Sequence, residues 1–152
     1  MEALNVLRLE KGFITHAEIH GRTTAFDIGM ARMISDKKDC IGKTLANRKG
    51  LLDEGREQLM GFKPVGAVKQ LTGGAHLYNE GDEATPAFDQ GYLTSVAFSP
   101  TFGHFLAQGF VRGGQARLGD RMRMVDQMRE IETIVEVCDP VFFDPKGERT
   151  RG

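Results

Sequence analysis

The chain has 152 residues, of which 40% are hydrophobic and 27% charged, with a formal net charge of -1. This length suits one domain, or a small domain with an appendage, and the hydrophobic content supports a packed core. A net charge this close to zero provides no general attraction to nucleic acid or to an anionic membrane, so we expect neither partner. No apolar run approaches the roughly 18 residues of a membrane span, and the charged start "MEALNVLRLEKG" is unlike a secretory signal.

The first 56 residues have a mixed, partly helical pattern. Ala3, Leu4 and Leu7 share one face of an expected helix, and Gly12 is suited to its C-terminal stop. A second helix is expected from about 41 to 52, with Asp39 as its N-terminal cap. The residues between these two segments fit a strand or a loop equally well.

From residue 57 onward, short strands alternate with turns at the spacing of a small barrel. The expected strands are 58–65, 74–79, two around the Ser-Pro-Thr-Phe-Gly turn within 91–111, 121–125 and 130–137. The strand at 104–111 has apolar residues on both faces, so we expect it to be buried on both sides. We predict an α+β, mainly β fold: a Greek-key-like antiparallel barrel over 57–152, preceded by the partly helical segment 1–56.

The two cysteines and four histidines do not form a metal site or a disulfide framework. Cys40 and Cys138 are far apart and unaccompanied, which fits a reducing cytoplasm. In "HAEIH" at 16–20, the acid Glu18 is one residue too late for a zinc-protease motif. We therefore predict no metal ligand, and His16 and His20 are interpreted as surface histidines.

No catalytic constellation is visible in the residues. Ser95 and Ser99 accompany His76 and His104 in the barrel, but sequence gives no spacing that defines a triad. The glycines follow no dinucleotide-binding pattern between a strand and a helix. We predict no catalytic residue in this chain.

Several segments nevertheless resemble one known family in order and spacing. "GYLTSVAFSPTFGHFLAQGFV" at 91–111 resembles the C-terminal barrel of the glycine-cleavage aminomethyltransferase family, and "LRLEKGF" at 7–13 resembles its Arg-x-Glu-x-Gly segment. The segment from 8 to 43 and the closing "DPVFFDPKGERTRG" are most similar to the alpha-subunit branch of heterotetrameric sarcosine oxidases. The resemblance covers nearly the whole chain and implies that residues 1–56 are the remnant of a folate-binding domain.

The resemblance implies tetrahydrofolate as the ligand. In such oxidases a flavin oxidises sarcosine to an imine, folate takes the one-carbon unit as methylenetetrahydrofolate, and glycine and hydrogen peroxide are released. FAD, FMN and NAD are implied only for the parent complex, and the implied partners are the other subunits, chiefly the flavin-bearing beta subunit. The family's general-base aspartate and pterin-binding glutamate lie upstream of this chain, so we expect a fragment that is inactive alone.

Arg8 is the one ligand contact that the resemblance implies here. The arginine of "LRLE" contacts folate in the family, and a guanidinium can hold a carboxylate through two parallel bonds. The alternative for Arg8 is a surface arginine paired with Glu2 or Glu10. For the hairpin at 91–111, scaffold and folate-cleft wall both remain open.

Three functional alternatives follow. The first is the folate-binding part of a sarcosine oxidase alpha subunit. The second is a fragment of an aminomethyltransferase or a folate-dependent demethylase. The third is a non-catalytic interaction barrel whose N-terminal piece docks on a separate chain.

Overall fold

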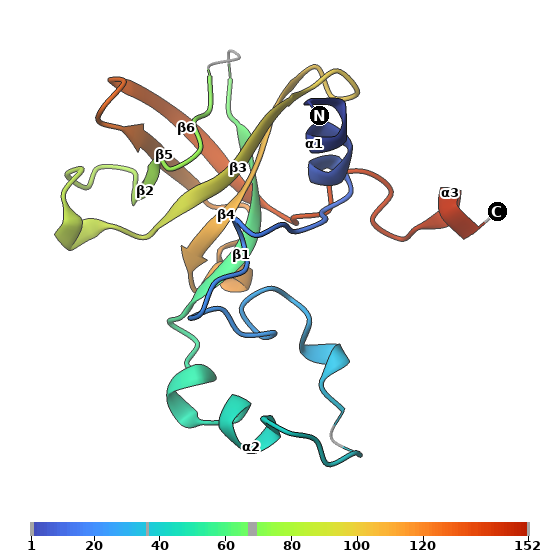
Figure 1. The fold of residues 1–152 in the computed structure, drawn as a ribbon. Coiled ribbons are helices and arrows are strands. Elements are labelled where there is room, and N and C mark those ends of the chain that lie inside the picture. The colour runs from blue at the N-terminus through green and yellow to red at the C-terminus, as the bar shows by residue number, and fades with distance from the viewer. Residues whose placement is uncertain (1, 36, 67–69, 152) are drawn as a thin grey trace.

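A computed structural model describes residues 2–35, 37–66 and 70–151, and its centre is a closed antiparallel barrel (Figure 1). The strands are β1 (Glu57–Pro64), β2 (His76–Asn79), β3 (Gly91–Ser99), β4 (His104–Arg112), β5 (Arg121–Asp126) and β6 (Ile131–Cys138). The α-helices are α1 (Glu2–Glu10), α2 (Lys43–Ala46) and α3 (Glu148–Arg151), and the 3-10 turns are η1 (Ala31–Met33), η2 (Lys49–Leu51), η3 (Pro86–Phe88) and η4 (Gly114–Arg117).

Around the barrel the strands run β1-β4-β3-β2-β5-β6, and β6 pairs with β1 to close it. Strands β2, β3 and β4 follow one another as hairpin neighbours, while β5 returns to pair with β2, which is a Greek-key connection. The expected mainly β fold with a Greek-key-like barrel is therefore confirmed.

The core follows the alternation that the strand sequences predict. Met122 and Met124 of β5 are fully buried, as are Val135 and Val137 of β6. Because side chains alternate across a strand, the intervening arginines and glutamates of these strands lie on the outer surface.

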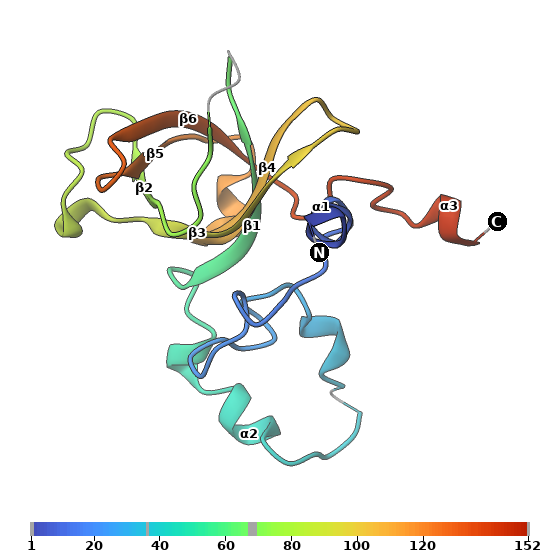
Figure 2. The ribbon, with the colours of Figure 1, turned by 45° about the horizontal axis from the view of Figure 1, so that its top comes forward.

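The outer face of β4 is also buried. Ala107 and Val111 enter the core, while Leu106, Gln108 and Phe110 point the other way and are still covered. The cover comes from α1 and the chain that follows it, which cross the β3–β4 hairpin (Figure 2). The two-sided burial expected of this strand is confirmed. Its cover is the N-terminal segment, joined at Gln108 by the C-terminal segment, where Nε2 donates to the Pro140 carbonyl at 3.3 Å.

A β-bulge in β3 changes which side chains face that cover. Leu93 lies opposite Gly109 and Ser95 lies opposite Gln108, so Thr94 is the extra residue. Val96 then packs against the core, whereas Thr94 and Ser95 both reach outward. Two neighbouring hydroxyls therefore meet the N-terminal segment from one strand.

The first expected helix is confirmed, and the second is wrong in extent. α1 ends at Glu10, and Gly12 follows in the left-handed region with φ of 77°. Within 41–52 only the four-residue α2 and the turn η2 form. α2 is preceded by Gly42 in the left-handed conformation, with no side-chain cap from Asp39, and Ile41 and Leu45 lie in solvent. A helix this short gains little without packing against an apolar surface.

Within the residues that the structure describes, no helix has the length and apolar character needed to cross a membrane.

Candidate functional site

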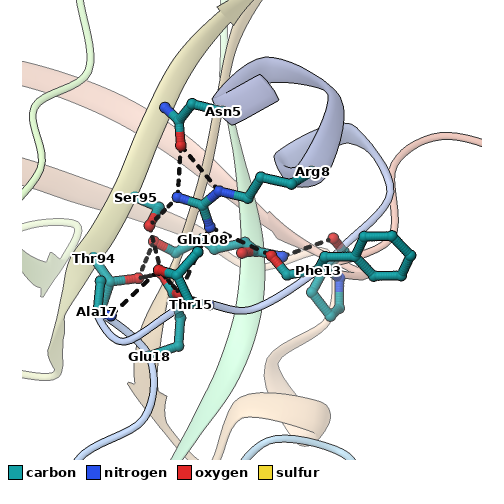
Figure 3. Close-up of polar contacts among 10 residues, drawn as sticks. Asn5, Arg8, Phe13, Thr15, Ala17, Glu18, Thr94, Ser95 and Gln108 are labelled. Carbon is teal, nitrogen blue, oxygen red and sulfur yellow. Dashed lines mark hydrogen bonds and ion pairs between the residues drawn. The ribbon is translucent and has the colours of Figure 1, made fainter. Parts of the chain in front are cut away.

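Arg8, the predicted ligand contact, projects from α1 towards the bulge of β3 (Figure 3). Its Nε and Nη2 donate to Oδ1 of Asn5 at 2.9 and 2.8 Å, and Nη2 also donates to Oγ of Ser95 at 2.8 Å. The side chain is 14% exposed. Arg8 therefore pairs with residues other than the Glu2 or Glu10 that sequence offered as alternatives.

Glu18 is the centre of this cluster and is fully buried. Its Oε2 accepts from the backbone N–H and the hydroxyl of Thr15 at 2.7 and 2.9 Å. Its Oε1 accepts from the hydroxyls of Thr94 and Ser95 at 2.7 and 2.5 Å. These contacts fasten the turn after α1 to the outer face of the barrel.

The environment of Glu18 favours its ionised form. Burial by itself raises the pKa of this carboxyl, but the hydrogen bonds from Ser95, Thr94 and Thr15 outweigh it and bring the pKa below the usual range. The guanidinium of Arg8 completes the set, with Nη1 at 3.6 Å from Oε2 of Glu18. A buried carboxylate with this many donors is a structural anchor and a weak base.

Ser95 links the arginine to the carboxylate. Its hydroxyl donates to Glu18 and at the same time accepts from Nη2 of Arg8. With Nε and Nη2 engaged, the remaining nitrogen is Nη1, whose contacts are long: 3.4 Å to the carbonyl of Phe13 and 3.6 Å to Glu18. Nη1 is therefore the nitrogen of Arg8 with the longest contacts.

Glu10 and Ser99 form a second buried pair on the same face. The hydroxyl of Ser99 donates to Oε1 of Glu10 at 2.5 Å, and the N–H of Phe143 donates to the Glu10 carbonyl at 2.7 Å. This pair joins α1 to β3 and to the C-terminal segment. The β3–β4 hairpin is thus the scaffold to which the first residues attach, through hydroxyls on its outer face.

An open pocket of about 540 Å³ lies beside this region. Arg22, Arg56 and Arg112 line it together with the rings of Tyr92 and Phe110. Its acids, which include Glu57, balance the arginines in number, so the pocket has no strong preference for one sign of charge.

Asp27 and Arg56 form a close ion pair at this pocket. Arg56 Nε and Nη2 donate to the two carboxylate oxygens of Asp27 at 2.9 and 2.6 Å. Burial raises the pKa of Asp27, but the bonds from Arg56 and Thr24 outweigh it and bring the pKa below the usual range. The pair joins residues 29 positions apart.

The "HAEIH" segment is a turn in the structure, and its histidines do not converge with Glu18. His20 is exposed and contacts the ring of Phe110 edge-on, with 6.1 Å between the ring centroids. Glu18, in contrast, is buried against the outer face of β3. Over the described ranges, no three His, Cys, Asp or Glu side chains gather closely enough to hold a metal ion.

Sequence reasoning missed Glu18 and Ser95 as members of this cluster. A signal for Glu18 was present: "THAE" is a Thr-x-x-Glu capping box, in which the acid returns to the N–H of the threonine. "TAFD" at 24–27 repeats the pattern, and Asp27 binds the N–H of Thr24 at 2.8 Å. Ser95 could not be found in this way, because the bulge in β3 decides whether its side chain faces outward.

Comparison with known proteins identifies the family to which the barrel belongs. Residues 57–144 match the family described as the glycine cleavage T-protein C-terminal barrel domain, and the chain belongs to that family. The crystal structure of the glycine cleavage system aminomethyltransferase T from Bartonella henselae has the same fold, with a TM-score of 0.73 and 22% identity over 94% of this chain and 38% of that one.

The curated relatives define the branch more closely. The chain is 39% identical over 150 residues to the sarcosine oxidase subunit alpha of Rhizobium meliloti (strain 1021), and 33% identical over 156 residues to that of Corynebacterium sp. (strain P-1). These matches cover 98% and 99% of this chain but 15% and 16% of the relatives. The chain is therefore a homologue of a small part of sarcosine oxidase alpha subunits.

Proposed function

We propose that this chain is the part of a sarcosine oxidase alpha subunit that helps to bind tetrahydrofolate. In this role it assists transfer of the one-carbon unit from oxidised sarcosine to the folate. Support comes from relatives named sarcosine oxidase subunit alpha, which match almost every residue of the chain at up to 39% identity.

The observation that carries the proposal is the hydrogen bonding of the Arg8 guanidinium. Asn5 and Ser95 fix its Nε and Nη2, while Nη1 keeps only long contacts. The guanidinium is always charged, so a carboxylate or ring carbonyl of folate can accept a charge-assisted bond from Nη1. The residues fit a contact through one nitrogen, in place of the two-bond grip that the sequence suggested.

The chain's own part in the reaction is to bind and orient. Tetrahydrofolate supplies the nitrogen atoms that accept the one-carbon unit. Glu18, the buried acid beside Arg8, has its oxygens occupied by four hydrogen-bond donors and a lowered pKa, so it is poorly suited to remove a proton. The catalytic base is expected in another part of the assembled protein.

The same proposal assigns the remaining chemistry to partners. Amine oxidation requires a cofactor that accepts electrons, so FAD, FMN and NAD are assigned to the parent complex, with the flavin-bearing beta subunit as chief partner. We place the complex in the cytoplasm, because both cysteines are free and nothing in the chain's composition calls for an oxidising compartment.

An aminomethyltransferase or folate-dependent demethylase part is the second candidate. The barrel fold shared with the Bartonella henselae protein supports it, but at 22% identity that likeness concerns the fold alone. Whole-chain relatives with at least 33% identity favour the oxidase. A non-catalytic interaction barrel remains the third candidate.

The test is folate affinity in an assembled protein. The chain is combined with a Rhizobium meliloti alpha subunit from which the matching 150 residues are deleted, and tetrahydrofolate is titrated calorimetrically. Arg8→Ala should weaken binding by roughly 1.5–3 kcal/mol, the range for a hydrogen bond to a charged group, or about ten- to a hundredfold.

Two further variants control this titration. Arg8→Lys keeps a charge beside Glu18 and should give an intermediate affinity. Arg121→Ala removes an exposed arginine of β5, whose ion pair with Glu80 is 4.0 Å long, and should change nothing. Unchanged affinity of Arg8→Ala in a complex that still assembles would remove Arg8 from the site.

A further inference from the structure

Residues 28–55, called the arm here, leave the barrel and return to it at one point. The ion pair of Asp27 with Arg56 joins the two ends, and the N–H of Leu59 donates to the Asp27 carbonyl at 2.7 Å. Between these ends the chain extends away from the barrel, carrying α2 at its far side (Figures 1 and 2). The arm is thus held firmly at its base and reaches outward.

The arm has no core of its own. None of its described residues is buried, although several of its side chains are large and apolar. Ile41 is exposed as fully as in an extended chain, Met33 is 78% exposed and Leu45 is 54% exposed. The helical pieces of the arm span three or four residues each, too short to be stable without packing.

The arm is also basic. Positions 28 to 55 contain six lysines and arginines against four acids, a net charge of +2 in a chain whose total charge is -1. The basic residues are Arg32, Lys37, Lys38, Lys43, Arg48 and Lys49. Several exposed apolar side chains within one segment are typical of a surface that another molecule covers.

We propose that the arm is a docking element whose partner is a protein surface with an apolar strip bordered by carboxylates. The relatives supply the candidate: they match this chain over 98–99% of its length, yet it makes up only 15–16% of theirs. This inference rests on the proposed function, under which the occupant is the remainder of a sarcosine oxidase alpha-type polypeptide. A second copy of this chain fits less well, because two basic arms repel each other.

The hydrogen bonds of Asp27 at the base of the arm fix where the arm leaves the barrel. Asp27 is bonded by Arg56 and by the hydroxyl and N–H of Thr24, which fixes the point where the arm begins. Arg56 also donates to the carbonyl of Arg22 at 3.1 Å. Because both ends are held against β1, the arm presents its apolar side chains from a defined position on the barrel.

The experiment measures binding of the whole chain to the Rhizobium meliloti alpha subunit lacking the matching 150 residues. Sedimentation velocity or surface-immobilised binding at low and high salt gives the affinity. The double variant Ile41→Asp, Leu45→Asp should weaken binding at least tenfold. The matched control Leu118→Asp, Met128→Asp changes exposed apolar residues of the barrel and should bind like the parent chain.

A charge variant tests the second half of the proposal. Lys37→Glu with Lys49→Glu should weaken binding several-fold and reduce its dependence on salt, because exposed charges attract less at high ionic strength. Arg8→Ala should bind the truncated subunit normally. Failure of folate binding and failure of docking are therefore separate results.

Four outcomes would overturn the docking proposal. They are no binding by the parent chain, equal binding by the arm and barrel variants, self-association that the arm variants abolish, and preferential binding to phosphatidylcholine–phosphatidylglycerol vesicles. Hydrogen exchange of the chain alone gives an independent check. Arm amides should exchange rapidly, and protection equal to that of β4 would contradict an arm that lacks packing.

Discussion

Glu18 and Asp27 each close a short turn in which a threonine three residues earlier donates both its N–H and its hydroxyl to the carboxylate. Each acid then adds a distant partner: Ser95 of β3 for Glu18, and Arg56 for Asp27. The local half of each contact can be predicted from the Thr-x-x-acid spacing. The distant half depends on how the barrel is folded, so sequence alone does not supply it.

Glu18→Gln tests the anchoring role of this carboxylate. The folded-state pKa of Glu18 lies below the usual value of 4.5, so its contribution to stability is present above that pH and is lost as the pH falls through the folded-state pKa. At pH 7 the variant should be less stable by roughly 1–3 kcal/mol, because buried donors lose a charged acceptor.

Urea unfolding at pH 7 and at pH 3 measures this difference. The free energies of the parent chain and of Glu18→Gln should converge as the pH falls. A constant difference between them at both pH values would show that the ionised form of Glu18 is not what stabilises the turn.

The two thiols should differ sharply in reactivity. Burial raises the pKa of Cys138 to about 12, whereas Cys40 lies in the exposed part of the arm. Only the thiolate reacts readily, so a disulfide reagent at pH 8 should modify one thiol of the native chain and two after unfolding. Rapid modification of both in the native state would contradict the raised pKa of Cys138.

Among the elements, the strands could be predicted from sequence and the second helix could not. Alternating Met122 and Met124 identified β5, and a polar turn marked the β3–β4 hairpin. In the segment 41–52, an apolar spacing suited to a helix exists, but none of the residues that the structure describes covers Ile41 or Leu45. The apolar periodicity predicts which face of a helix would be buried, but it does not show whether another part of the protein packs against that face.

Gly109 shows how closely β3 and β4 pack. A Cβ at this position would overlap the carbonyl oxygen of Tyr92 and crowd the Cα of Leu93, both in the backbone of the neighbouring strand. Gly109→Ala should therefore lower the free energy of unfolding by roughly 1–3 kcal/mol, the cost of overpacking. Gly21→Ala is the matched control: its Cβ would meet no atom within 4 Å, and thermal unfolding should hardly change.

At the scale of the whole molecule, the two parts of the chain should differ in stability. All but one of the fully covered apolar side chains lie from residue 59 onward, and Leu9 is the exception in the described N-terminal part. We predict that residues from about 57 to 145 form the stable unit and that the first 50 residues are less protected. Amide exchange should be slowest at 107–111 and 131–137, and slowest exchange at 3–12 would contradict this division.

We propose above that this chain contributes to a folate site and depends on further protein for its chemistry. The most direct test supplies sarcosine, tetrahydrofolate and free flavin to the purified chain, and follows hydrogen peroxide and methylenetetrahydrofolate. We expect neither product, because the described residues near Arg8 include no suitable base and the resemblance assigns the cofactors to the parent complex. Turnover above that of a heat-denatured control would contradict the claim.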